Sequence, residues 1–390
     1  MDRIRFADSP IGTLVPIRGT DGRTGEPYDH VAFIPAPLGE EPPLTNAAWR
    51  AVTAAHRALG ALDQAGQQVP EPSILRRPTL RREAQSTSAL EGTFAPLAEV
   101  LGADEREGHG AELAEVLNYV SAAELAYNAL SDGHRLSLTL LTELHRHLVR
   151  GTGADTRDAG RVRSIQVAIG GRSSKVTDAR FVPSPPGLEL EAALRDLLDW
   201  TNRTGADQRD PVVSAAIAHY QFETLHPFND GNGRLGRLLI VLGLLQEGVI
   251  REPLLTVSPW FEARRRAYQD GLAELSVSGD WSSWVEFFAR GVEESARDTI
   301  VVVDRLLALS ESYAQRLRDA NVRGVAVDVA ASLVAKPILT VRDAADASGK
   351  GYQTASNALQ KLQELGVLVE YGSSYPKRFL APEVLTALTS

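Results

Sequence analysis

Apolar residues recur at intervals of three and four along most of this chain, a pattern typical of helices with one buried face. The segments that show it most clearly are 49–64, 79–90, 112–131, 189–201 and 289–321. Two more, 211–225 and 238–245, are apolar on nearly every side and carry few charges, so we expect mostly buried helices there. The pattern predicts a mainly α fold.

One segment interrupts the helical pattern. Residues 160–183 alternate apolar and polar side chains on either side of a Gly/Ser turn, which is typical of a β-hairpin. A single hairpin in a helical protein calls for an explanation. The simplest explanation is structural: the hairpin is a loop that packs over the helical core.

The two ends of the chain differ from the middle. Residues 1–44 are rich in Pro, Gly and charged side chains, which predicts an extended arm rather than a packed unit. Near the other end, 341–348 and 353–365 predict two helices, and 367–379 predicts a hairpin around 372–374. The second of these helices is expected to bury Ala355, Ala358, Leu359, Leu362 and Leu365.

Composition narrows the class of protein. The chain has 390 residues, 43% of them hydrophobic, which is enough for two or three domains with a substantial core. It has no cysteine, which excludes disulfides and thiolate chemistry and, with no apolar leader, predicts a cytoplasmic protein. Its longest apolar run, 238–245, is far too short to cross a bilayer. A net charge of -9 argues against general nucleic-acid affinity.

The most informative segment is 226–237, which reads His-Pro-Phe-Asn-Asp-Gly-Asn-Gly-Arg-Leu-Gly-Arg. Gly231, Asn232 and Gly233 fall between two predicted buried helices, so they form a turn that opens the second one. Unpaired N–H groups and the positive end of the helix dipole make such a turn favourable for an anion, such as phosphate.

Four side chains add chemistry to this anion site. Arg234 and Arg237 are three apart, so they share a helix face and can each offer a forked contact to phosphate oxygens. Asp230 supplies the hard oxygen ligand that Mg²⁺ prefers beside phosphates. His226, with an ordinary pKa of about 6.5, can take a proton from an attacking hydroxyl. Each piece alone is usually structural, but together they predict a nucleoside triphosphate site.

At these residues the chain resembles the Fic family, whose motif His-Pro-Phe-x-Asp/Glu-Gly-Asn-Gly-Arg-x-x-Arg it matches at every fixed position. The resemblance implies a Fic-type helical bundle and a protein adenylyltransferase, which transfers AMP from ATP to a Ser, Thr or Tyr hydroxyl of a target protein. It assigns His226 as the catalytic base and Asp230 as the Mg²⁺ ligand. Gly231, Asn232, Gly233, Arg234 and Arg237 would hold the phosphates.

A second match lies upstream, at Thr87-Ser-Ala-Leu-Glu91-Gly92. By itself this is an ordinary helix end, since Gly92 can adopt the left-handed conformation and Glu91 lies one turn beyond Thr87. Beside the Fic core it resembles the family's inhibitory motif, Ser/Thr-x-x-x-Glu-Gly/Asn. The resemblance implies that Glu91 pairs with Arg237 and keeps ATP from binding productively, so that the enzyme is autoinhibited.

The resemblance also gives the hairpin a sharper role, as a flap whose edge adds a strand to the target peptide. The expected edge comprises Val176, Thr177, Asp178, Ala179, Arg180 and Phe181. Residues 258–268 resemble the helix that closes the nucleotide pocket, with Tyr268 as a candidate contact to base or ribose. Family members often have a second tyrosine where this chain has Gln269.

These matches divide the chain into an extended arm (1–44), an N-terminal helical region with the inhibitory helix (45–110), a Fic catalytic core (111–300) and a linker helix with a small domain (301–390). That last domain resembles a winged helix-turn-helix. From residue 340 to 390 its five basic and five acidic residues balance. DNA binding and a protein-docking or dimerising role are therefore equal alternatives.

Two functions from different classes are weighed. One is a self-inhibited adenylyltransferase, acting on a target protein or on itself and able also to remove AMP if Glu91 positions water. The other is a winged-helix regulator that senses nucleotide without turnover. The complete set of His226, Asp230, Arg234 and Arg237 favours the enzyme, because a sensor needs no base. A homodimer is expected by family analogy, and no membrane partner is expected.

Overall fold

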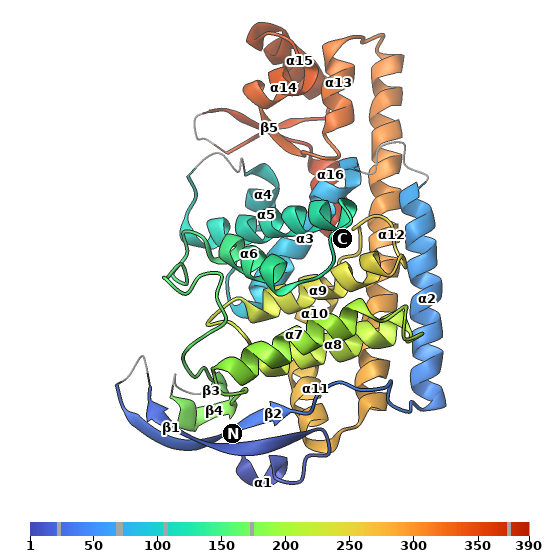
Figure 1. Cartoon of the computed structure of the whole chain (residues 1–390). Helices are drawn as coiled ribbons and strands as arrows, with labels where there is room; N and C mark the ends of the chain where they lie inside the picture. The colour runs from blue at the N-terminus through green and yellow to red at the C-terminus, as the bar shows by residue number, and fades with distance from the viewer. Residues whose placement is uncertain (22–24, 68–72, 104–107, 172–174, 373–375, 390) are drawn as a thin grey trace.

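A computed structural model describes residues 1–390 of the chain except 22–24, 68–72, 104–107, 172–174, 373–375 and 390. The described part is mainly helical, as predicted (Figure 1). Its longer helices before residue 250 are α2 (Asn46–Gln67), α3 (Ser73–Glu91), α5 (Ala111–Ser131), α6 (Leu138–Val149), α7 (Leu188–Asn202), α8 (Pro211–Leu225) and α9 (Asn232–Gln246). Shorter ones are α1 (Arg3–Phe6) and α4 (Leu97–Gly102).

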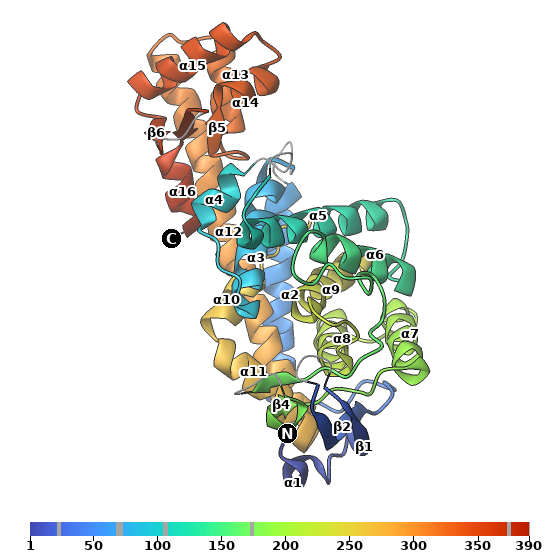
Figure 2. The same ribbon diagram turned by 90° about the vertical axis from the view of Figure 1, so that its left-hand side faces the viewer.

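Helices α8 and α9 form the centre of the bundle, with α3, α5, α6 and α7 packed around them (Figures 1 and 2). Both central helices are buried on almost every side, which explains why their sequences lack a polar face. Two more helices, α10 (Ser258–Ala263) and α11 (Arg265–Ser278), follow α9. The 39-residue α12 (Trp281–Asp319) runs along α2 and links the bundle to the C-terminal section.

The prediction of an extended arm over residues 1–44 was wrong. This segment contains α1 and an antiparallel hairpin of β1 (Gly12–Thr20) and β2 (Pro27–Pro35). The hairpin packs against the middle of the chain through a cluster of three rings, in which the centroids of Phe6, Phe33 and Phe181 lie 5.7 to 5.9 Å apart. Burial of these aromatic side chains offsets the entropy of ordering a Pro- and Gly-rich segment.

The predicted central hairpin is present but shorter than expected. It pairs β3 (Ile169–Gly171) with β4 (Ala179–Phe181), and the Gly/Ser turn between them falls partly at 172–174, outside the described residues. Val176–Asp178 form a 3₁₀ turn, η1, rather than strand, so the predicted edge 176–181 is wrong over its first half. The side chain of Val176 is buried in a small cluster with Ile17 and Ala32 of the N-terminal hairpin, which favours the tighter turn.

The C-terminal section contains α13 (Val325–Ser332), β5 (Ile338–Thr340), α14 (Val341–Ser348), α15 (Tyr352–Glu364), β6 (Val369–Tyr371), β7 (Arg378–Leu380) and α16 (Pro382–Thr389). Its three strands form an antiparallel sheet in the order β5-β7-β6. Of the predicted apolar face of α15, Leu365 is only partly buried, and the others are buried. That the section is a winged helix-turn-helix stays a prediction.

The C-terminal section contacts the bundle at α4. Gly102, the last residue of α4, packs directly against the side chain of Ile338 in β5. The buried guanidinium of Arg81 in α3 donates to the carbonyls of Val100 and Ala103, so α4 is tied to α3. Helix α4 therefore lies between the C-terminal sheet and the helix that ends at Glu91.

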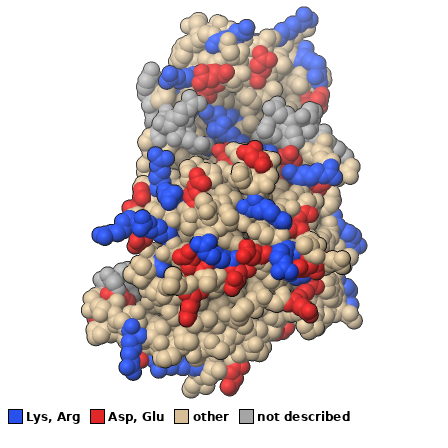
Figure 3. Space-filling view, in the orientation of Figure 1, with Lys and Arg blue, Asp and Glu red and all other residues tan. Residues whose placement is uncertain are grey.

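The face shown in Figure 3 carries interspersed acidic and basic side chains. No helix among the described residues is both long and apolar enough to span a membrane.

Candidate functional site

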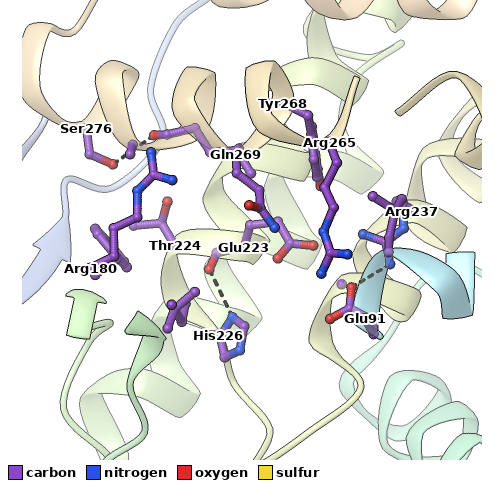
Figure 4. Close-up of a pocket in the computed structure, with 17 residues that line it drawn as sticks. Glu91, Arg180, Glu223, Thr224, His226, Arg237, Arg265, Tyr268, Gln269 and Ser276 are labelled. Carbon is purple, nitrogen blue, oxygen red and sulfur yellow. Dashed lines mark hydrogen bonds and ion pairs between the residues drawn. The ribbon is translucent and has the colours of Figure 1, made fainter. Parts of the chain in front are cut away.

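A cavity of about 320 Å³ lies where the ends of α3, α8 and α9 meet the hairpin β3–β4 and α11 (Figure 4). The predicted site residues Glu91, His226, Gly233, Arg237 and Tyr268 line it. Arg180 and Phe181 line it from the hairpin. The cavity thus brings together residues that are far apart in the chain.

The end of α8 places His226. Asp210 caps the start of this helix by accepting hydrogen bonds from the N–H groups of Val212 and Val213. At the other end His226 takes a left-handed conformation, with φ of 49°, and so turns the chain out of the helix. Because a left-handed histidine is uncommon, the surrounding contacts must hold this turn in place.

The holding contact is made by Arg163, which sequence reasoning missed. Its side chain is 1% exposed and donates to the carbonyls of His226 at 2.8 Å, Leu225 at 3.3 Å and Ile165 at 3.0 Å, and also to Ser184. A cation at the C-terminal end of a helix is favourable because the helix dipole is negative there. Nothing in the sequence shows that these carbonyls converge on one arginine.

The imidazole of His226 is neutral at neutral pH. Burial lowers its pKa to about 4, and the charge of Arg163 acts in the same direction. Its Nδ1 atom lies 3.3 Å from the carbonyl oxygen of Glu223 and donates to it, which leaves Nε2 as the atom with a lone pair. The side chain can therefore accept a proton at Nε2.

The loop between His226 and α9 is held by several hydrogen bonds and a ring stack. The side-chain amide of Asn232 accepts from the N–H of Phe228 at 2.9 Å and donates to its carbonyl at 2.8 Å. The ring of His145 stacks on Phe228 and bridges the N–H of Gly160 and the carbonyl of Asp230. The side chain of Asn232, expected at the phosphates, thus shapes the loop, and only its backbone N–H is left to face an anion.

Gly231, the residue directly before α9, has a left-handed φ of 76° and gives the helix no side-chain cap. The carboxylate of Glu91 is seated at this N-terminus. A Cβ atom at Gly233 would lie 2.0 Å from Oε1 of Glu91, so only glycine allows the carboxylate to approach the helix so closely. The anion-binding end of α9 is therefore occupied by a carboxylate of the protein itself.

The guanidinium of Arg237 holds that carboxylate. Its Nη2 atom donates to Oε1 of Glu91 at 2.6 Å and to the carbonyl of Thr87 at 3.0 Å, and its Nε donates to Oγ1 of Thr87 at 2.7 Å. Burial alone would raise the pKa of Glu91, but the charge and hydrogen bond of Arg237 outweigh it and lower that pKa. Glu91 is therefore ionised at neutral pH.

The second arginine has different partners. The side chain of Arg234 is 2% exposed and pairs with Glu115, which also accepts a hydrogen bond from Thr93 at 2.8 Å. Its Nη2 atom lies 3.4 Å from Oδ1 of Asp230. Arg234 thus ties α5 and the segment after α3 to the site loop. Its role as a phosphate contact stays a prediction.

Tyr268 lies in the cavity wall, but its hydroxyl is engaged. The hydroxyl donates to Nε2 of His219 at 2.7 Å, and Nδ1 of His219 donates to the carbonyl of Gly236 at 3.0 Å. Burial lowers the pKa of His219 to about 3, so this ring is the neutral acceptor that the tyrosine needs. Tyr268 can offer its ring to a ligand while its hydroxyl stays bonded.

A further acid in the cavity was not predicted as a site residue. Glu223 lies on α8, one turn before His226, and lines the cavity. Burial raises its pKa to about 8, with Glu91 adding to the effect and Arg237 opposing it. The signal was present in the sequence as a single acid in an otherwise uncharged buried helix.

The hairpin closes one side of the cavity. Arg180 of β4, which lines the cavity, forms an ion pair with Asp270 of α11. On its other side β4 is followed by Val182, whose carbonyl accepts from the N–H of Phe33 at 2.9 Å. Strand β2 thus flanks this end of the hairpin, and the outer edge of β3 has no strand partner within the described residues.

These features define a class: a helical protein with an anion site at the start of a buried helix, an arginine below it, and a neutral histidine base beside it. Within the described residues, the anion site holds the protein's own carboxylate.

Comparisons with known proteins give the family. Residues 135–244 match the Fic/DOC family, and residues 49–128 match the Fic/DOC family N-terminal region. The chain is 39% identical over 169 residues to the protein adenylyltransferase fic-1 of Caenorhabditis elegans, and 28% identical over 251 residues to the protein adenylyltransferase Fic of Drosophila grimshawi. These matches cover 43% and 63% of this chain. These two regions of the chain belong to the Fic/DOC family.

The match to these curated relatives spans only 29% and 46% of their own length. A solved structure covers more of the chain: that of a Fic family protein from Desulfovibrio desulfuricans matches 88% of this chain and 98% of its own, with a TM-score of 0.56 and 24% identity. This likeness supports the fold.

Proposed function

We propose that this protein is an adenylyltransferase that moves AMP from ATP to a hydroxyl side chain of a target protein, and that Glu91 restrains it. The observation that carries the proposal is the carboxylate of Glu91 bound at the N-terminus of α9 by Arg237. A carboxylate seated there stands in for a phosphate group of a nucleotide. The curated relatives named as protein adenylyltransferases support the same activity.

The chemistry follows from the positions of the side chains. A target hydroxyl attacks the α-phosphorus of ATP while its proton passes to Nε2 of His226. The new bond joins the hydroxyl oxygen to phosphorus, the bond from phosphorus to the bridging oxygen breaks, and pyrophosphate leaves. With Glu91 displaced, Arg237 and the N–H groups at the start of α9 bind the phosphates and stabilise the charge on the leaving group.

The donor set fits Mg²⁺ held between the protein and the nucleotide. Asp230 has a side chain that is 55% exposed, and its Oδ1 accepts from the N–H of Gly231 at 2.6 Å, so Oδ2 is available to a cation. The described residues contain no group of three or more His, Asp or Glu that could form a complete metal site. Mg²⁺ usually binds to one or two carboxylates plus phosphate oxygens. When bound, the ion would neutralise phosphate charge.

The hairpin is the proposed docking site for the target peptide. Because β2 flanks the far side of β4, we place the added strand on the outer edge of β3 and not along 176–181. Gly170 of β3 lines the cavity, so a strand added there would run past the cavity that contains His226. Main-chain hydrogen bonds could then position the target hydroxyl regardless of the neighbouring side chains.

The test uses the purified protein, labelled ATP and Mg²⁺, with the proteins of a cell lysate and the chain itself as acceptors. The Glu91→Gly variant is expected to label protein more strongly than the unchanged chain. The double variant Glu91→Gly/His226→Ala should give no label, although it binds ATP. Equal labelling by the two variants would remove the catalytic assignment, and ATP binding without labelling by Glu91→Gly would favour a nucleotide sensor.

A further inference from the structure

The carboxyl group of Glu223 has no partner for one of its oxygens. Its Oε1 atom is fully buried and makes no hydrogen bond with the described residues. It lies over Gly236 in α9, where a Cβ atom would come within 2.4 Å of it. Figure 4 shows the side chain in the middle of the cavity, between Gln269 and the Arg237–Glu91 pair. A buried polar atom without a hydrogen-bond partner destabilises the fold, and a bound ligand can supply the missing hydrogen bond.

The guanidinium of Arg237, which acts on the pKa of Glu223, is not hydrogen-bonded to this oxygen. The Nε and Nη2 donors of Arg237 go to Thr87 and to Glu91. Glu91 and Glu223 both act on the guanidinium of Arg237, and Glu91 holds it. When two carboxyl groups lie close together in a buried site, ionising both is unfavourable because the charges repel, so one of them retains a proton. The paired Glu91 is the ionised one, and Glu223 is the one that keeps its proton.

We propose that Glu223 recognises the polyphosphate of the nucleotide as a neutral carboxyl group, by donating a hydrogen bond to a phosphate oxygen beside Arg237. This inference rests on the proposed function, because it assumes that a nucleotide replaces Glu91. An ionised Glu223 would repel the phosphates, whereas a protonated one offers an O–H donor in a site of low polarity. The two arginines and the N-terminus of α9 are the other proposed donors to the phosphates. Glu223 would add an uncharged donor to them.

The proposal predicts an unusual dependence on pH. Burial and Glu91 raise the pKa of Glu223 to about 8, and loss of Glu91 would lower it somewhat. The other titratable groups that face it are Arg237 from α9, Tyr268 and Arg265 from α11, and His226 at the end of α8. Bound phosphate raises the pKa of Glu223 above its value in the free protein. Affinity for ATP is therefore lost as the pH rises through the pKa that Glu223 has in the free protein.

The experiment measures ATP binding by calorimetry, from pH 6.5 to 9.5, in the Glu91→Gly/His226→Ala background, which exposes the site and stops turnover. Affinity should fall with rising pH, by about tenfold per unit at the steepest point. Adding Glu223→Gln, which keeps a donor but cannot ionise, should preserve the affinity at pH 7 and abolish the fall. Glu274→Gln, which neutralises an exposed acid on α11 outside the cavity, should leave the fall unchanged.

Three results would overturn the proposal. One is an unchanged pH profile in the Glu223→Gln variant. Another is an equal effect of Glu223→Gln on the binding of adenosine, which has no phosphate. A third is a loss of discrimination between ATP and deoxy-ATP, which would place Glu223 at the ribose. If the background variant binds no ATP at any pH, the proposed function itself fails, and that outcome is distinct from all three.

Discussion

The carboxylate of Glu91 and the guanidinium of Arg237 lie 2.6 Å apart, although 146 residues separate them in the chain. The pair joins the last residue of α3 to the first turns of α9. The same contact places the carboxylate over Gly233, so the charge that would receive a phosphate and the space that would hold it are both occupied.

Replacing Glu91 by Gln should release the site in part. The amide keeps the size and one acceptor for Arg237 but loses the charge, and a hydrogen bond between charged groups is worth roughly 1.5–3 kcal/mol. Because Glu91 is one-third exposed, we expect ATP affinity to rise by only about tenfold, less than in Glu91→Gly. Calorimetry checks this, with Glu99→Gln on α4 as a control. If Glu91→Gln bound ATP as tightly as Glu91→Gly, the size of the side chain at this position would contribute nothing to the restraint.

Replacing Arg163 by Lys should slow AMP transfer without weakening ATP binding. Lysine keeps the charge but cannot reach the carbonyls of Leu225, His226 and Ile165 together. The turn at His226 would then shift, and misplacement of a base by about 1 Å can cost about a hundredfold in rate. Labelling rates in the Glu91→Gly background check this, against Arg161→Lys as the exposed control. A parallel loss of ATP affinity would mean that the whole loop has moved.

The low pKa of His226 sets the acid limit of activity. A base must be unprotonated to act, and burial holds the pKa of this ring at about 4. In the Glu91→Gly variant the loss of a nearby negative charge lowers it further. We expect kcat/KM to stay level as the pH falls from 7 to about 5, since kcat/KM reports the free enzyme. A fall centred near the ordinary value of about 6.5 would contradict the buried, neutral imidazole.

Replacing Tyr268 by Phe should destabilise the fold more than it affects the ligand. The change leaves Nε2 of the buried His219 without its donor, which costs roughly 1–3 kcal/mol. The ring that faces the cavity is kept, so ATP affinity should change by less than about threefold. Thermal unfolding and calorimetry check the two parts, with the exposed Tyr352→Phe as a control. A larger loss of affinity than of stability would assign the hydroxyl to the ligand.

Replacing Asp230 by Asn should raise the Mg²⁺ concentration that labelling requires. The side chain is more than half exposed, so the fold should tolerate the change. Loss of one charged oxygen ligand weakens a site that has few protein ligands. A titration of labelling rate against Mg²⁺ in the Glu91→Gly background measures the shift. An unchanged midpoint would place the ion on the nucleotide alone.

The helices and the anion loop could be predicted because their signals are local. Apolar spacing located the helices, and the order of residues in 226–237 identified the loop. The contact between Glu91 and Arg237 was expected only from the family resemblance, since no spacing rule connects residues so far apart.

The errors have physical causes. In residues 1–44, the prediction followed the Pro and Gly content and gave too little weight to the short apolar run around Phe33. That ring is buried against Phe181, which belongs to a distant segment of the chain. At Val176 a strand-forming residue was placed in a turn by packing on Ile17 and Ala32. Arg163 was missed because its partners are backbone carbonyls, which no sequence pattern shows to converge.

At the contact of Gly102 with Ile338 there is no room for even one more methyl group between helix α4 and strand β5. If β5 is pushed inward, α4 must be displaced, and Arg81 passes that displacement to α3, whose last residue is Glu91. Ten residues separate Arg81 from Glu91 on one continuous helix. The C-terminal section and the carboxylate that occupies the cavity are therefore connected through α4 and α3.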